Sequence, residues 1–218
     1  MKISKTVSAL LLGTMVAFSG CGSDDDNMQT PATTYTYSVM VTNVTAGQPM
    51  SPVVVTSNSI FSVGESASVS LEKLAEGGDN SELLDANGVS GTGLLTPGSS
   101  EIMTLNTTSK TISLATMLVK TNDGFAGFNG LNLSALSVGA STTLYASVYD
   151  AGTEANSETN TTVAAFGVEG FNATRDDSDM VTLHSGIISN EDGLATSALS
   201  AQAKFNSQAL YVNVTRTK

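Results

Sequence analysis

The stretch Tyr35–Asn43 has the sequence YTYSVMVTN, in which two kinds of side chain alternate. The two tyrosines, Val39 and Val41 fall on one face, and the residues between them fall on the other. A period of two is typical of a β-strand with one buried face. The stretch therefore predicts the first strand of a β-sheet protein.

Similar runs recur along the chain. They are separated by turn residues, and the chain is rich in Thr, Ser, Val, Ala and Gly but has no tryptophan. This composition favours strands and turns. We predict an all-β fold, an eight-stranded antiparallel β-sandwich with one or two short inserted helices. The further predicted strands are Val53–Ser57, Glu101–Asn106, Thr111–Lys120, Thr142–Tyr149, Met180–Ser185 and Ala209–Arg216.

One segment has helical spacing. Within Ala67–Glu76, Leu71 and Leu74 recur at the helical period, and the paired glycines Gly77-Gly78 predict where the helix ends. Asp79 then caps a second turn, with Glu82 three residues on and Leu83-Leu84 following. The four leucines are predicted to lie in the core.

The N-terminus predicts an export signal. Lys2 and Lys5 precede the apolar run Ala9–Phe18, which is too short to span a bilayer, and Ser19-Gly20 precede Cys21, the only cysteine. This pattern resembles a bacterial lipoprotein signal (residues 1–20), in which the cysteine is lipidated. The alternative is an unmodified thiol beside an ordinary cleavage site. A lone cysteine permits no intramolecular disulfide.

A polar segment follows the cysteine. Residues 21–34 include three consecutive aspartates and predict a lipid-anchored, acidic tether, leaving residues 35–218 as a single domain. The aspartates resemble a surface-export signal, and the alternative is a simple hydrophilic spacer. We therefore expect an exported protein at the outer membrane or cell surface, attached to the membrane by its lipid.

The charge of the chain is strongly acidic. Removal of residues 1–20 takes away two lysines and no acidic residue, so the formal net charge changes from −11 to −13. Such a chain repels nucleic acid and anionic lipid. Divalent cations suit it better.

Two acidic, glycine-containing stretches predict a cation site. They are Thr121–Gly127 (TNDGFAG) and Tyr149–Asn156 (YDAGTEAN), and each is interpreted as a loop that follows a strand-like run. Calcium takes six to eight oxygen ligands at about 2.3–2.6 Å from carboxylates, carbonyls and water. Asp123, Asp150 and Glu154 are the candidate ligands for Ca²⁺. The alternative is that these acids only cap turns.

Several blocks of the chain resemble the spondin N-terminal domain family. They extend over about residues 35–215. The blocks are Tyr37–Pro52, Val53–Thr56, Leu71–Gly78, Met117–Gly127, Tyr149–Glu154 and His184–Gly186.

The resemblance implies an eight-stranded antiparallel sandwich with calcium bound at one loop end. Asp123, Asp150 and Glu154 match carboxylates of the family pattern. The family also has an acid on a preceding strand; here the ungapped position is Thr104, and Glu101 lies nearby. Animal members are extracellular and serve adhesion and recognition.

Other chemistry has little support. His184 is the only histidine, no serine lies in a Gly-x-Ser-x-Gly motif, and zinc would need several nitrogen or sulfur ligands. His184 is predicted to be a structural residue at a strand end, with a role in the ion site as the alternative. The acidic run 176–179 is predicted to be a solvated loop, and a second ion site is its alternative.

Three functions remain open. The first is a non-enzymatic adhesion or recognition module that binds calcium and a surface or matrix ligand, either protein or glycan. The second is a calcium-dependent hydrolase of the envelope that uses the acids Asp150, Glu154 and Glu158. The third is an inert structural lipoprotein.

Overall fold

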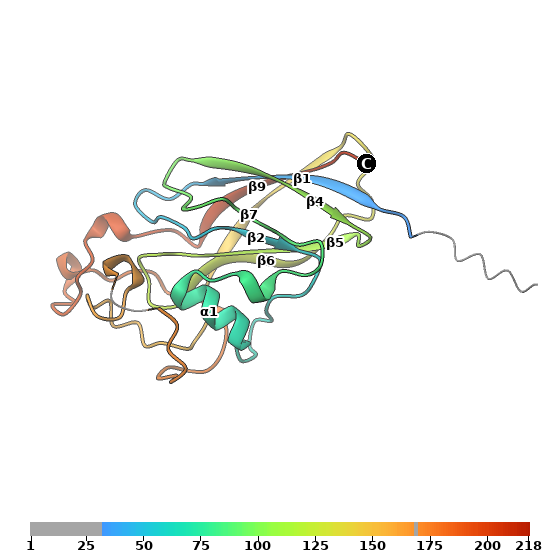
Figure 1. Cartoon of the computed structure of the whole chain (residues 1–218). Coiled ribbons are helices and arrows are strands. Elements are labelled where there is room, and N and C mark those ends of the chain that lie inside the picture. The colour runs from blue at the N-terminus through green and yellow to red at the C-terminus, as the bar shows by residue number, and fades with distance from the viewer. Residues whose placement is uncertain (1–31, 168–169) are drawn as a thin grey trace, which may run out of the picture. The chain divides into compact units, whose positions relative to one another are not determined.

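The computed structural model describes residues 32–167 and 170–218, and Ala32–Lys218 forms one compact unit (Figure 1). The predicted signal peptide and Cys21 lie outside the described residues, as does the tether up to residue 31. The described part of the chain contains no helix of the length and apolar character needed to cross a membrane.

The described residues are mostly β-structure with one α-helix. The helix is α1 (Val69–Gly77), and short 3₁₀ turns are η1 (Ser81–Leu83), η2 (Ala164–Phe166), η3 (Asn190–Asp192) and η4 (Ala201–Ala203). The strands are β1 (Tyr35–Asn43), β2 (Val54–Thr56), β3 (Val89–Ser90), β4 (Ser100–Thr107), β5 (Thr111–Met117), β6 (Gly124–Asn132), β7 (Ser141–Asp150), β8 (Thr182–Leu183) and β9 (Gln208–Arg216).

All strand pairs are antiparallel and belong to one sheet in the order β3-β2-β5-β6-β7-β9-β1-β4, with β8 paired to β7. The sheet folds over so that its two ends approach each other. Next to β3, Thr92 donates from its main-chain nitrogen (2.8 Å) and its hydroxyl (2.9 Å) to Glu101 Oε1 on β4. The prediction of an all-β antiparallel fold is confirmed.

The main core lies inside the folded sheet. The alternation of β1 is confirmed, since Tyr37, Val39 and Val41 are fully buried while the residues between them are half-buried. These side chains meet inward residues of β4, β5, β7 and β9 in one cluster. The hydrophobic effect, at about 25 cal/mol per Å² of apolar area, makes this burial the main stabilising term.

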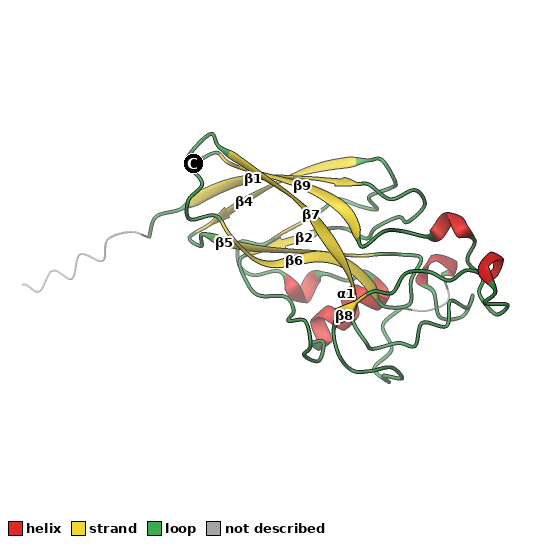
Figure 2. Cartoon of the chain, turned by 180° about the vertical axis from the view of Figure 1, so that it is seen from behind, coloured by secondary structure: helices red, strands yellow, loops and turns green. Residues whose placement is uncertain are grey.

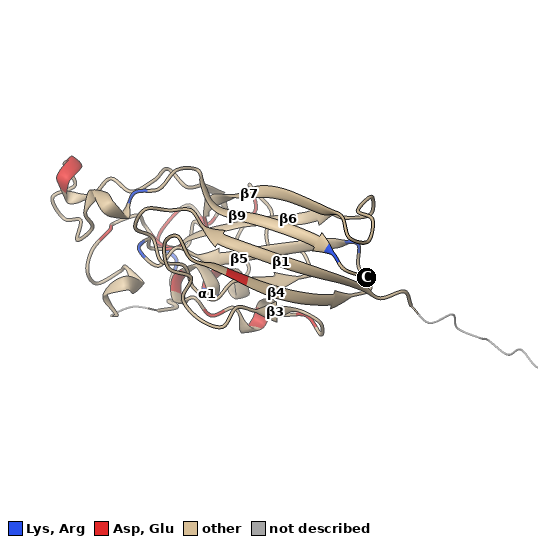
Figure 3. Cartoon of the chain, turned by 90° about the horizontal axis from the view of Figure 1, so that it is seen from above, with Lys and Arg blue, Asp and Glu red and all other residues tan. Residues whose placement is uncertain are grey.

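A second core lies between α1 and the outer side of β2, β5 and β6. Ser68 caps the helix by accepting from Leu71 N at 3.2 Å, and Gly78 ends it with φ of 72°. Leu71, Leu74 and Leu83 are buried as predicted, and Leu84 packs partly buried beside them. Strands β2, β5 and β6 are therefore covered on both sides, whereas β7, β9, β1 and β4 form an outer layer that no helix covers (Figure 3).

The interpretation of Thr121–Gly127 as a loop is wrong from Gly124 onward, because Gly124–Asn132 forms β6. The glycines hid this strand, since glycine is unfavourable in strand interiors. Gly127 is needed for close packing: a Cβ at this position would lie 2.4 Å from the carbonyl oxygen of Leu114 on β5. Asp123 therefore precedes a strand and does not end one.

The segment 151–207 between β7 and β9 is mostly irregular. The predicted strand Met180–Ser185 reduces to β8, and the remaining turns gather at one end of the sheet (Figure 2). Val163, Ile187, Leu199 and Ala203 form a small separate core there. This end of the molecule also holds Asp123, Asp150 and Glu154.

Gly127→Ala should destabilise the protein by about 2–3 kcal/mol, because β5 and β6 must separate to admit the methyl group. Chemical denaturation measures the loss. Gly93→Ala is the matched control, since a Cβ there meets nothing within 4 Å. Equal stability of the two variants would contradict the close approach of β6 to β5.

Candidate functional site

Asp123 lies in the turn between β5 and β6 and is fully buried. Its Oδ2 accepts from the main-chain nitrogens of Thr153 (2.7 Å) and Glu154 (3.1 Å) and from the Thr153 hydroxyl (3.2 Å). Its Oδ1 is buried and has no hydrogen-bond partner among the described residues. A buried polar atom without a partner costs about 1–3 kcal/mol, so Oδ1 is a site where a ligand would be stabilising.

Asp150 ends β7 and lies beside Asp123. Asp150 on β7 is paired with Gly124 on β6. The next residue, Ala151, donates from its main-chain nitrogen to the carbonyl oxygen of Asp123 at 3.2 Å. The carboxylate is 5% exposed and accepts from Gly152 N (2.8 Å) and from Asn156 Nδ2 (2.6 Å). The structure thus brings two predicted ligands, Asp123 and Asp150, to the same end of the sheet.

The negative charge of Asp150 raises the free energy needed to ionise Asp123. Burial, followed by the negative charge of Asp150, raises the pKa of Asp123 from 3.8 to about 7, against the opposing effect of the hydrogen bonds from Thr153 and Glu154. None of the ion pairs among the described residues involves Asp123 or Asp150. The pair therefore lacks a positive side chain to neutralise it.

His184 lies next to these acids. A Cβ on Gly124 would lie 2.9 Å from its Cδ2, and its ring packs edge-on against Phe205 with 5.1 Å between centroids. Nδ1 accepts from Gly186 N at 2.9 Å, so the neutral ring carries its proton on Nε2, which is buried without a partner among the described residues. Burial lowers the pKa of His184, and the charges of Asp150 and Glu158 oppose this effect.

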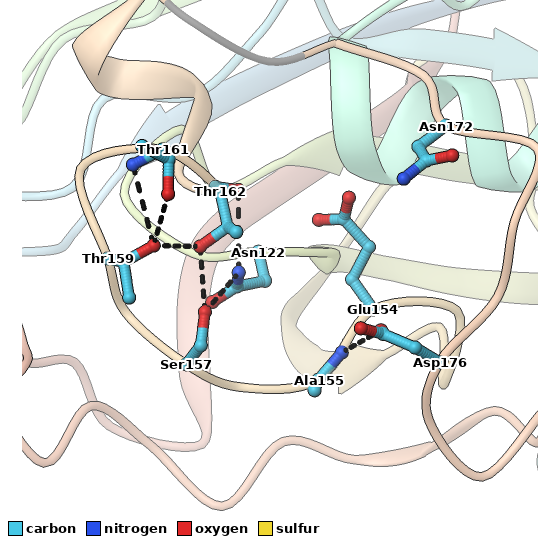
Figure 4. Close-up of a pocket in the computed structure, with 9 residues that line it drawn as sticks. All are labelled: Asn122, Glu154, Ala155, Ser157, Thr159, Thr161, Thr162, Asn172 and Asp176. Atoms are coloured by element: carbon cyan, nitrogen blue, oxygen red, sulfur yellow. Dashed lines mark hydrogen bonds between the residues drawn. The ribbon is translucent and has the colours of Figure 1, made fainter.

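Glu154, the third predicted ligand, connects the acid pair to a pocket. Its main-chain nitrogen bonds to Asp123, and its carboxylate points into a cavity of about 350 Å³ (Figure 4). Beside Glu154, Asp176 Oδ1 accepts from Ala155 N at 2.8 Å. The remaining lining residues are polar hydroxyl and amide side chains: Asn122, Ser157, Thr159, Thr161, Thr162 and Asn172.

Glu158 is buried and has a structural role. Its Oε1 accepts from Ile188 N (2.7 Å), and its Oε2 accepts from Ser189 N (2.9 Å) and the Ser197 hydroxyl (2.6 Å). These bonds join residues far apart in the 151–207 segment. No local pattern in the sequence indicates this role, because the donors come from turns that only the fold brings together.

Glu101 does not join Asp123 and Asp150. Glu101 lies on the inward side of β4, opposite Val41. Its carboxylate accepts hydrogen bonds from Thr92 and so links the two ends of the sheet. Thr104 does not join them either, because it is exposed on the outward side of β4, opposite Ser38. The strand that leads into the Asp123 turn is β5, which contains no acidic residue.

The acidic run 176–179 is partly a structural loop. Arg175 donates to the buried Glu72 carboxylate through Nε (3.1 Å) and Nη2 (2.7 Å), and it also pairs with Asp179. These contacts attach the loop to α1. Asp177 is exposed, in agreement with the predicted solvated turn.

Within residues 32–167 and 170–218, no group of three or more His, Cys, Asp or Glu side chains is arranged to hold a metal ion. Comparison with protein-family models and with curated proteins gave no match for the chain. The site must therefore be interpreted from its own geometry.

In protein freed of divalent ions, the contribution of Asp123 to the free energy of unfolding should fall as the pH rises from 4 to 8. The pKa of Asp123 is higher in the folded state (about 7) than its ordinary value of 3.8. Its protonated form therefore stabilises the fold below pH 4, and this contribution is lost as the pH rises through 7. The difference between these two pKa values corresponds to a change of about 4 kcal/mol in the free energy of unfolding.

Thermal melts in chelator from pH 4 to 8 measure this dependence, and Asp123→Asn should flatten it. Asp177→Asn removes the same charge from an exposed position and should leave the pH profile as in the wild type. If the Asp123→Asn and wild-type profiles coincide, the Asp123 carboxyl is not the source of the pH dependence of stability.

Proposed function

We propose that this chain is a calcium-binding, non-enzymatic recognition module on a lipid anchor. The observation that carries the proposal is the buried Asp123 Oδ1, which has no hydrogen-bond partner among the described residues and lies beside a second buried carboxylate. A divalent cation at this point would satisfy Oδ1 and neutralise both acids.

The donor chemistry fits calcium better than zinc. Asp123 and Asp150 supply carboxylate oxygens, and the neighbouring carbonyl, amide and hydroxyl groups are the neutral oxygens that calcium also accepts. His184 carries its proton on the nitrogen that lies free of other bonds, so it is a poor zinc ligand. Asp123 and Asp150 would hold the ion, with the other ligands drawn from neutral oxygens and water.

When bound, calcium would order the loops that carry its ligands. Asp123 already links the start of β6 to the turn after β7 through Thr153 and Glu154. An ion on the opposite oxygen would fix that turn and, through Glu154, one wall of the adjoining pocket.

The resemblance to the spondin N-terminal domain supports an adhesion or recognition role and a sandwich arrangement of the folded sheet. Asp123 and Asp150, two of the acidic positions that match the family pattern, lie side by side at the ends of β6 and β7. In the same proposal, Cys21 is the lipidated residue and anchors the domain at the outer membrane or cell surface.

The geometry of the acids supports a binding role over hydrolysis. A glycosidase needs two carboxyl groups that reach a bound sugar. Asp123 and Asp150 are buried, and Glu158 is held by three hydrogen-bond donors. Of Asp123, Asp150, Glu154 and Glu158, Glu154 is the one that lines the pocket described above.

Calcium should raise the melting temperature of residues 32–218 relative to chelator. Binding to the folded state alone contributes about 1.4 kcal/mol at ten times the dissociation constant. Asp150→Asn should abolish the shift, whereas Asp177→Asn, which removes the same charge from an exposed loop, should retain it. Calorimetric titration with CaCl₂ gives the stoichiometry. An unchanged melting temperature with no heat of binding would refute the ion site.

A further inference from the structure

The outward face of β7, β9, β1 and β4 carries no charged side chain in a chain with 20 acidic and 9 basic residues. These strands contain Glu101, Asp150 and Arg216, and all three lie on the other side. Glu101 pairs with Val41 and Arg216 pairs with Tyr37, both at fully buried positions, and Asp150 is itself buried. In Figure 3 the four strands are tan along most of their length, the colour of residues other than Lys, Arg, Asp and Glu.

This uncharged face has a row of aromatic and hydroxyl side chains. In register across the strands lie Ser100, Thr42, Tyr211 and Tyr145. The two tyrosine rings lie 5.4 Å apart at 62°, and Tyr145 is 51% exposed. Large aromatic side chains that remain exposed on the face of a sheet favour a binding surface.

The adjoining row is Ile102, Met40, Asn213 and Thr143, in which Ile102 is 66% exposed. Beyond it, hydroxyl pairs link neighbouring strands, such as Ser141 Oγ and Thr215 Oγ1 at 2.7 Å. Thr42 Oγ1 and Ser100 Oγ form a similar pair at 2.7 Å. Each hydroxyl has one donor and two acceptor positions, so these pairs retain capacity for further hydrogen bonds.

We propose that this face binds a neutral polysaccharide chain. Tyrosine rings stack on the C–H faces of sugar rings, and hydroxyl and amide groups bond to sugar hydroxyls without the cost of desolvating a charge. Strand spacing of about 4.8 Å means that a ligand crossing the four strands would span about 15 Å. A polyanion such as nucleic acid or an acidic glycan would find no cation on the face.

The complementarity of the face to a neutral ligand is one of charge. The rest of the molecule is acidic, so an anionic partner is repelled, whereas a cationic partner would be drawn to the acidic surface elsewhere and not to this face. A neutral partner is the one that the face selects. The inference rests on the proposed recognition role but not on calcium.

The test is affinity gel electrophoresis of residues 32–218, a compact unit with its own core, in gels that contain hydroxyethylcellulose, xyloglucan, galactomannan or laminarin. Alginate is the acidic control. Retardation by at least one neutral polysaccharide and not by alginate is the expected result. Each gel is run with calcium and with chelator, and binding should persist in chelator.

Two sets of variants locate the binding. Tyr145→Ala with Tyr211→Ala should weaken it about tenfold, as truncation of aromatic contact residues often does. Tyr145→Phe with Tyr211→Phe keeps the rings and should retain most of the binding. Should the double alanine variant fail to fold, Thr143→Glu places one charge at an exposed position of the face and should also weaken binding. Ala86→Glu, in the exposed turn before β3, is its control.

The outcomes separate the two proposals. Polysaccharide binding in chelator, together with a failed calcium titration, would support the proposed binding face and refute the proposed calcium site. Retardation by none of the neutral polysaccharides, or equal binding by Thr143→Glu and Ala86→Glu, would overturn the inference. So would a dimer, detected by light scattering, that Thr143→Glu dissociates, because the face would then belong to a second copy of the chain.

Discussion

The loop end of this molecule depends on one buried carboxylate. Asp123 Oδ2 accepts two main-chain N–H groups and a hydroxyl from the turn that follows β7. It thereby ties the start of β6 to the start of the long 151–207 segment. Its Oδ2 is satisfied, whereas its Oδ1 has no hydrogen-bond partner within the described part of the chain. The group therefore links these segments and leaves an acceptor available for a cation.

Buried acids also organise the remainder of that segment, which has little regular structure. Glu158 gathers main-chain and hydroxyl donors from residues 188–197, and Glu72 binds Arg175 to α1. A small apolar core assists them. Since a buried carboxylate that loses its donors is costly, these contacts specify one arrangement for a segment that hydrophobic burial alone would leave undefined.

The two outer sides of the sheet differ in what covers them. Helix α1 and its leucines pack against β2, β5 and β6. The outer sides of β7, β9, β1 and β4 are uncharged, with hydroxyl, amide and tyrosine side chains exposed. The proposed ion site and the proposed glycan face thus lie in separate parts of one domain, so each can be tested without the other.

The sequence by itself determined the strand character, since the alternation of β1 and the capped helix α1 follow from local periodicity and local hydrogen bonding. It also marked Asp123 and Asp150 as acids beside glycine. Only the tertiary structure decided that Gly124–Asn132 is a strand, because its glycines are explained by the approach of β5 and not by any local preference. The placement of Glu101 and the donors of Glu158 were likewise undetermined, because a carboxylate's partner is set by which distant backbone the fold brings within hydrogen-bond distance.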